Sequence, residues 1–154
     1  MRTAFWKRGC CIVNVLFVCT GNTCRSPMAA AIFNHKWKDK GQAKSVGIFA
    51  AEGEAVAYHS IQILKEQGID LQHQSAQITE EHVDWAELIL TMTASHKAMV
   101  LSQYPKAADK TFTIKEYVDK QATNIDVLDP YGGDLQVYHS TYTELNDLIN
   151  RLFD

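Results

Sequence analysis

The sequence predicts an α/β fold, with one four-stranded parallel sheet and helices on both of its faces. The chain has 154 residues, which suits a single domain with a core of its own. Hydrophobic residues make up 46% of it and charged residues 21%, as in ordinary globular proteins and unlike disordered chains. Short apolar runs rich in β-branched and aromatic residues alternate with segments in which apolar residues recur at helical spacing, and this alternation is typical of a parallel sheet covered by helices.

The first strand, loop and helix are the clearest elements. The strand is expected at residues 12–18, where the run IVNVLFV indicates a strand buried on both faces. After a tight loop, a helix begins near Pro27, which the first turn of a helix tolerates, with Ser26 placed as its N-cap. Apolar residues recur at helical spacing from there to Gly41, where the helix is expected to end.

The rest of the chain continues the alternation of strands and helices. The predicted elements are a strand at 45–50, a helix at 56–67, a helix from Thr79, a strand at 87–92, a helix from Thr93 to about 103, a strand at 110–113, a helical turn at 114–118, a loop at 119–133 and a helix from about 134. With four strands, the simplest arrangement is a small doubly wound, flavodoxin-like domain. Ligands bind beyond the carboxyl ends of the strands in such domains, so the loop after the first strand is the first candidate site.

Composition also limits the organisation and the partners of the chain. Residues 1–12 show no periodicity and are expected to be an N-terminal appendage to a single domain at 13–154. With 15 Lys and Arg against 18 Asp and Glu, the net charge of −3 gives no reason to expect a nucleic acid or a membrane as partner. The four cysteines all lie in the first 24 residues, a spacing that fits neither a secreted disulfide framework nor a zinc site. We therefore expect free thiols in the cytoplasm, a monomer, and no metal or other cofactor.

The loop that begins at Cys19 and ends at Arg25 carries the strongest chemical signal. A loop this short between a strand and a helix N-terminus can aim successive backbone N–H groups inward, and the helix dipole adds partial positive charge. Gly21 and Asn22 are residue types that tolerate the left-handed conformations that such a loop requires. The sequence therefore predicts a cradle for a tetrahedral dianion, which the planar guanidinium of Arg25 can grip through two oxygens.

Cys19 is expected at the floor of this cradle, where the positive field favours its thiolate. A thiolate there can attack phosphorus in line and form a phosphocysteine, which water then hydrolyses. Ser26 can hydrogen-bond the sulfur and help it to leave. The alternative interpretation is a buried core thiol with Arg25 as a surface cation, but the preceding strand and the following helix start favour the chemical role. Walker-type nucleotide binding is excluded because the chain has no GKS or GKT triplet.

Asp129 is the candidate general acid, because a leaving group expelled from phosphorus needs a proton. Pro130 stiffens the backbone after it, and Gly132 and Gly133 let the loop fold over a cleft. Tyr131 is expected to form one wall of the pocket. An Asp-Pro pair also occurs as an ordinary turn, so this assignment depends on the cradle.

Two motifs of the chain resemble the low-molecular-weight protein-tyrosine-phosphatase family, VLFVCTGNTCRSP and the late DPYGG. The resemblance covers about residues 13–154, and it is greatest to the bacterial protein-arginine-phosphatase branch, through CTGNTCRSP, TMTASHK, FTIKEYV and VLDPYGG. It implies the fold of that family, with Cys19 as nucleophile, Arg25 as phosphate clamp and Asp129 as general acid.

The resemblance also implies roles for residues in and around the loop. It implies that Asn22 is held by hydrogen bonds with Ser45 and His73, which keep the loop preorganised. The other histidines are expected on the surface or on helix faces. The residues expected to bind the substrate are Thr20, Gly21, Asn22, Thr23, Cys24, Ser26 and Tyr131.

Thr23 and Cys24 carry the finer expectations. Tyrosine-specific relatives usually have a bulkier aliphatic residue at position 23, whereas the arginine-phosphatase branch is similar to this chain in having Thr. A hydroxyl there can narrow the pocket rim, although Thr23 can also simply fit the loop. Relatives imply that Cys24 forms a reversible disulfide with the nucleophile, but this thiol can also only fill space beneath the loop.

Together these observations predict a metal-independent cysteine phosphatase that acts on phosphorylated proteins, with phosphoarginine as substrate and phosphotyrosine as the alternative. Arsenate reductases coupled to thioredoxin use a similar fold and loop, but they need further cysteines downstream, and none follows Cys24. A non-catalytic phosphoanion-binding or redox-sensing module is the second alternative.

Overall fold

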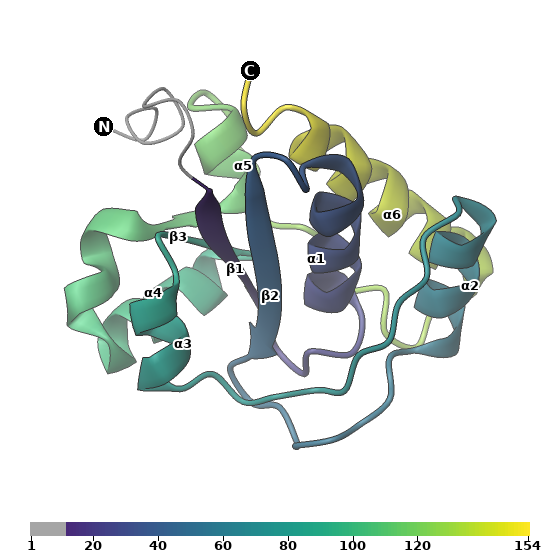
Figure 1. Ribbon diagram of the computed structural model, residues 1–154, viewed down its shortest axis with the longest axis horizontal. Helices are drawn as coiled ribbons and strands as arrows, with labels where there is room; N and C mark the ends of the chain where they lie inside the picture. The colour runs from purple at the N-terminus through teal and green to yellow at the C-terminus, as the bar shows by residue number, and fades with distance from the viewer. Residues whose placement is uncertain (1–11) are drawn as a thin grey trace.

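The protein is built on one four-stranded sheet in which every pair of neighbouring strands is parallel (Figure 1). The structure is a computed structural model that describes residues 12–154, so the expected appendage lies outside the described residues except for Ile12. The strands are β1 (Val13–Cys19), β2 (Gly41–Gly47), β3 (Leu88–Thr91) and β4 (Thr111–Thr113). Their order across the sheet is β2-β1-β3-β4. The predicted doubly wound arrangement is thus confirmed.

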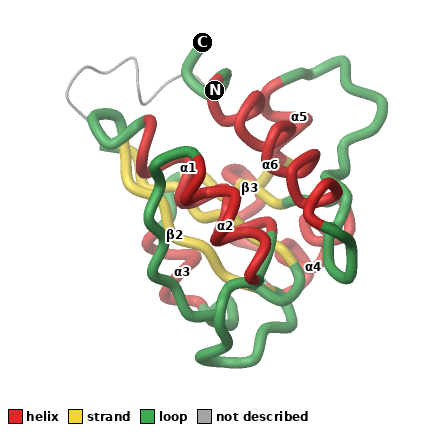
Figure 2. The backbone as a smooth tube through the Cα atoms, turned by 90° about the vertical axis from the view of Figure 1, so that its right-hand side faces the viewer, coloured by secondary structure: helices red, strands yellow, loops and turns green. Residues whose placement is uncertain are grey.

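Helices cover both faces of this sheet. They are α1 (Arg25–Lys36), α2 (Tyr58–Glu66), α3 (Glu80–Trp85), α4 (Ala94–Gln103), α5 (Ile114–Val118) and α6 (Leu135–Asn150), with a 3₁₀ helix at Pro105–Lys110. Figure 1 shows α1, α2 and α6 on one side of the sheet and α3 and α4 on the other, and in Figure 2 the first group lies in front of the strands. No helix within residues 12–154 is long and apolar enough to cross a bilayer.

Strand β1 supplies side chains to two hydrophobic cores, one on each face of the sheet. Val15 and Phe17 pack in the core beneath α1 and α6, whereas Leu16 and Val18 pack in the core beneath α3 and α4. Successive side chains of a strand point to opposite faces, so a strand in the middle of a covered sheet is apolar at nearly every position. This is why the first strand could be predicted from its apolar run, which only Asn14 interrupts.

Strand β2 begins four residues earlier than predicted, at Gly41 instead of residue 45. It is an edge strand, and Gln42 and Lys44 are exposed while Ala43 is buried, so its apolar pattern is too weak to mark it. Gly41 does not end the preceding helix, which stops at Lys36. A side chain at Gly41 would clash with the backbone of β1, so the glycine allows the two strands to pair closely.

The N-terminus of α1 differs from the prediction in a way that concerns the site. The expected capping residue Ser26 lies inside the first turn, and the residue at the cap position, Cys24, makes no side-chain capping bond. The helix starts predicted at Thr79 and Thr93 are confirmed, because these two residues are N-caps whose hydroxyls accept from backbone N–H groups of α3 and α4. The first turn of α1 is therefore uncapped by side chains and points its free N–H groups toward the preceding loop.

Candidate active site

Two carbonyl oxygens of the loop between β1 and α1 are hydrogen-bonded to the segment that follows β2. Thr20 O accepts a hydrogen bond from Phe49 N at 3.0 Å, and Thr23 O accepts one from Ala57 N at 2.8 Å. The backbone N–H groups of residues 21–24 donate to no acceptor in the described part of the chain. Because the carbonyls are held on one side, the amides remain available to an anion on the other, as the sequence predicts.

Asn22 holds the loop in shape through all four of its side-chain hydrogen-bonding positions. Its Nδ2 donates to Ser26 Oγ at 2.8 Å and to Ser45 Oγ at 3.0 Å. Its Oδ1 accepts from His73 Nε2 at 3.0 Å and from Ala76 N at 2.9 Å. The contacts expected of Ser45 and His73 are therefore present, and a fully satisfied buried amide fixes the loop rigidly.

The backbone of the loop needs one left-handed residue. Asn22 has a φ of 59°, as predicted, and asparagine tolerates this conformation better than most residues. The same prediction is wrong for Gly21, which has no positive φ. A single left-handed residue is enough to turn the chain here. Gly47 supports the loop from outside, because a side chain there would clash with the carbonyl of Thr20.

Cys19 lies at the carboxyl end of β1, beneath the loop, and is only 2% exposed. Its Sγ is 2.9 Å from Ser26 Oγ. The Ser26 hydroxyl also accepts from Asn22 Nδ2 and has its single hydrogen within reach of Val46 O at 3.3 Å. That hydrogen can turn to a thiolate at Cys19, which accepts but does not donate. The geometry thus fits a serine that stabilises an ionised sulfur.

Arg25 is a buried cation that does not use all of its hydrogen-bond donors within the protein. The residue is 4% exposed, its Nη1 donates to Val127 O at 2.9 Å, and its Nη2 lies 3.5 Å from Asp129 Oδ2. Its Nε is buried and has no hydrogen-bond partner among the described residues. Buried donors are nearly always paired in proteins, so an unpaired guanidinium N–H beside the loop indicates a place where an anion binds.

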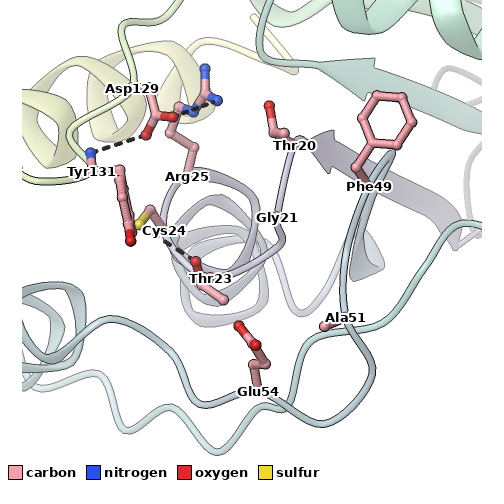
Figure 3. A pocket seen from close by; sticks show the side chains of 10 residues that line it. All are labelled: Thr20, Gly21, Thr23, Cys24, Arg25, Phe49, Ala51, Glu54, Asp129 and Tyr131. Carbon is pink, nitrogen blue, oxygen red and sulfur yellow. Dashed lines mark hydrogen bonds and ion pairs between the residues drawn. The ribbon is translucent and has the colours of Figure 1, made fainter.

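Asp129 lies across the pocket mouth, on the loop that precedes α6 (Figure 3). Its side chain is half exposed, and its Oδ1 accepts from Tyr131 N at 3.0 Å. Gly132 supplies a φ of 80° to the turn that follows. The turn chemistry predicted for this segment is therefore present, and it holds the Asp129 carboxylate next to the arginine.

These elements enclose a pocket of about 370 Å³. Its lining consists of Thr20, Gly21, Thr23, Cys24, Arg25, Phe49, Ala51, Glu54, Asp129 and Tyr131. Of the expected site residues, Cys19, Asn22 and Ser26 are buried and do not line the pocket, and Ser45 and His73 contact Asn22. The other residues expected to bind the substrate line the pocket, whereas the side chains of Asn22 and Ser26 support the loop and the sulfur instead.

Three residues of the pocket are missing from the sequence prediction, namely Phe49, Ala51 and Glu54. They come from the segment between β2 and α2, which carries no motif of its own. Figure 3 shows the Glu54 carboxylate at the side of the pocket opposite Asp129, with Thr23 between them. Two carboxylates thus flank the entrance, while the buried arginine lies deeper.

Two histidines beside the loop are uncharged at neutral pH. Burial lowers the pKa of His73 below its usual value. Burial, followed by the positive charge of Arg25, lowers the pKa of His96 to about 4. His96 is only 7% exposed and lies on helix α4, so of the two expected positions, on the surface or on a helix face, it takes the second. The positive charge of the site therefore comes from Arg25.

Cys24 is a buried thiol, with its Sγ 3.5 Å from Tyr138 Oη. Burial raises the pKa of this thiol, so it is protonated at neutral pH. Cys19 and Cys24 are both unpaired, and the reversible disulfide between them stays a prediction. Within residues 12–154, no three His, Cys, Asp or Glu side chains gather closely enough to hold a metal ion.

Comparisons with known proteins agree with this geometry. Residues 14–154 match the family described as low molecular weight phosphotyrosine protein phosphatase. A protein-arginine-phosphatase of Geobacillus stearothermophilus is 49% identical over 138 residues, covering 90% of this chain and 92% of that protein. The solved low-molecular-weight protein tyrosine phosphatase of T. tengcongensis superposes with a TM-score of 0.86 at 49% identity, over 91% of this chain and 97% of that one.

A further solved structure concerns the chemistry of the site. It is a mutant arginine phosphatase with a phosphorylated active-site serine, and it superposes with a TM-score of 0.86 at 40% identity, over 91% of this chain and 93% of that one. The matched family and these relatives span nearly the whole described domain. The resemblance that the loop and the DPYGG motif carry is confirmed, and the chain belongs to the low-molecular-weight phosphotyrosine protein phosphatase family.

Proposed function

We propose that this protein hydrolyses phosphoarginine in proteins, through a phosphocysteine formed on Cys19. Members of its family are protein phosphatases, and so is this chain. The observation that carries the proposal is the position of a buried thiol under a loop of unpaired N–H groups, beside an arginine with an unpaired Nε. This arrangement places a nucleophile, oxyanion donors and a cation around one tetrahedral group.

The reaction needs only groups of this chain and water. The Cys19 thiolate attacks phosphorus, the P–N bond breaks, and its electron pair leaves with the guanidine nitrogen, which takes a proton from Asp129. Water then attacks the phosphorus of the phosphocysteine and gives a proton to the Asp129 carboxylate. The S–P bond breaks, phosphate is released, and the sulfur leaves as a thiolate that Ser26 stabilises.

Three observations support phosphoarginine as the substrate. The relative from Geobacillus stearothermophilus is named a protein-arginine-phosphatase. Thr23 lines the pocket. It presents a hydroxyl there, which the bulkier aliphatic residue of tyrosine-specific relatives lacks. Glu54 lies at the entrance, and its negative charge suits a cationic guanidinium better than the neutral ring of phosphotyrosine. Phosphotyrosine is the second candidate because relatives such as the T. tengcongensis protein are named tyrosine phosphatases.

The substrate is tested by comparing two peptides of equal sequence, one with phosphoarginine and one with phosphotyrosine. We expect a higher kcat/KM for phosphoarginine in the wild type, and a loss of about tenfold or more for that peptide alone in Thr23→Ile. Thr23→Val keeps the shape of threonine and separates the hydroxyl from the added bulk. A wild-type preference for phosphotyrosine contradicts the proposal.

Glu54 provides an independent test of the charge argument. Glu54→Gln is expected to lower kcat/KM for the phosphoarginine peptide relative to phosphotyrosine by about three- to tenfold, which corresponds to the roughly 1 kcal/mol of a solvent-exposed charge pair. The matched control is Glu52→Gln, on the same segment but outside the pocket lining, with no change in the ratio. An equal ratio in all three proteins contradicts a role of Glu54 in selectivity.

The general-acid role is tested by the leaving group. Asp129→Asn is expected to lower kcat by roughly 10² to 10⁴-fold for phosphoarginine, and by much less for an aryl phosphate whose leaving phenolate needs no proton. Steady-state kinetics on both substrates measure this difference. The same loss for both would assign Asp129 to holding Arg25, 3.5 Å away, rather than to proton transfer.

We also propose that the protein acts on phosphorylated proteins in the cytoplasm, as a monomer and without a cofactor. Two unpaired thiols at the site support a reducing compartment. The alternative is a non-catalytic module that binds phosphoanions or senses redox state. It is excluded if the wild type hydrolyses either peptide, and if Cys19→Ser abolishes this turnover but still binds phosphate.

A further inference from the structure

Thr20 and His96 form a contact at the pocket that the reaction described above does not use. Thr20 follows Cys19 directly, and its side chain lines the pocket (Figure 3). Its Oγ1 lies 2.8 Å from His96 Nε2. His96 belongs to the first turn of α4, where its backbone N–H donates to Thr93 Oγ1 at 3.1 Å. Helix α4 follows β3, which pairs with β1, so the parallel sheet brings the histidine to the loop.

The surroundings of Nδ1 determine which nitrogen of the His96 imidazole carries the proton. His96 Nδ1 is buried and has no hydrogen-bond partner among the described residues. A neutral imidazole carries one N–H, either on Nδ1 or on Nε2. A proton on Nδ1 would leave a buried donor unpaired, which is costly and rare, whereas a proton on Nε2 leaves only an unused lone pair on Nδ1. The imidazole is therefore protonated on Nε2 and donates to Thr20.

This direction of donation determines what the Thr20 hydroxyl does. Because Oγ1 accepts from Nε2–H, the hydrogen of the hydroxyl is not shared with the histidine and is free to turn into the pocket. The pocket already holds unpaired donors from the loop backbone and from Arg25. A hydroxyl that donates in the same direction adds one further donor for a phosphoryl oxygen.

We propose that His96 is a positioning residue that makes Thr20 a hydrogen-bond donor to the phosphoryl group. The inference rests on the phosphatase function proposed above, but it concerns the phosphoryl group and not the group that leaves. The same effects are therefore expected with phosphoarginine peptides and with an aryl phosphate, whichever side chain the enzyme prefers.

Kinetic variants test both residues of the pair. Thr20→Val removes the hydroxyl at constant shape and is expected to raise the inhibition constant of inorganic phosphate and lower kcat/KM by roughly tenfold, the value of one hydrogen bond to a charged group. Thr20→Ser keeps the donor and retains most of the activity. His96→Leu is expected to cause a loss similar to that of Thr20→Val, while His96→Gln, whose amide nitrogen can take the place of Nε2, recovers most of it.

The coupling between the two residues separates positioning from a purely structural role. In the double variant Thr20→Val/His96→Leu we expect no further loss, because the histidine acts only through the hydroxyl. Each of three results would overturn the proposal. The losses of the two single variants multiply in the double variant, or His96→Leu lowers kcat/KM less than twofold. The third is that His96→Gln does not recover activity although its thermal stability is that of the wild type.

A measurement on the unmodified protein applies even where the leucine variant does not fold. The ¹⁵N chemical shifts of the His96 imidazole at neutral pH are expected to show the proton on Nε2. A proton on Nδ1 overturns the proposal, since Thr20 would then donate to the histidine. If the phosphotyrosine peptide proves to be the better substrate while these results hold, only the substrate assignment fails.

Discussion

Replacement of Cys19 by serine or alanine is expected to abolish turnover and to leave phosphate binding intact. The thiol is 2% exposed and lies beneath the loop, where the Ser26 hydroxyl can stabilise its ionised form. Loss of a covalent nucleophile lowers kcat by about 10⁴-fold or more in comparable enzymes. The donors that hold the anion belong to the loop backbone and to Arg25, so they survive the substitution.

Steady-state assays measure the loss of turnover, and equilibrium binding of inorganic phosphate measures whether the anion site remains intact. Serine is the closer replacement, since its hydroxyl can still contact Ser26, but it is a much weaker nucleophile than a thiolate. Alanine removes the reacting atom entirely. Residual kcat within tenfold of the wild type in either variant would show that the nucleophile is another group.

Replacement of Arg25 by lysine is expected to lower kcat/KM by about 10² to 10⁴-fold, the value of two lost hydrogen bonds to a charged group. The guanidinium now donates to Val127 O, faces Asp129 and keeps its Nε unpaired. A lysine ammonium is a single point of charge and cannot serve these directions together. The inhibition constant of inorganic phosphate is expected to rise in parallel.

The same exchange at Arg151 provides the matched control. Arg151 pairs with Asp147 at 3.2 Å on the exposed end of α6, and exposed pairs of this kind contribute little. Arg151→Lys is therefore expected to leave kcat/KM and phosphate binding unchanged. A decrease of less than tenfold in Arg25→Lys would contradict the assignment of Arg25 as the phosphate clamp.

The loop was predictable from the sequence because its parts are contiguous. Cys19 and Arg25 lie within seven residues of each other, and the strand and the helix on either side have patterns that local sequence determines. The prediction for Asp129 was more dependent on context. Its turn is local, with Tyr131 N donating to Oδ1, but only the fold brings that turn to the arginine.

The parts of the site that the sequence did not predict depend on long-range placement. His96 is 76 positions from its partner Thr20, and its sequence surroundings are those of an ordinary helix start. Glu54 lies on a segment without a helix or a named strand, and no local sequence pattern places it beside the loop. The start of strand β2 is also hard to predict, because its position at the edge of the sheet is set by the fold. An edge strand needs apolar residues on only one face, so its sequence pattern is weak.

The phosphocysteine on Cys19 is tested most directly by trapping the phosphoryl group on the enzyme. Wild-type protein is mixed with a phosphoarginine peptide, denatured within a single turnover and digested, and the phosphorylated residue is located by tandem mass spectrometry. We expect one phosphoryl group, on Cys19. A phosphoryl group on His73 or His96, or release of arginine peptide in the first turnover without any phosphorylated enzyme, would contradict it.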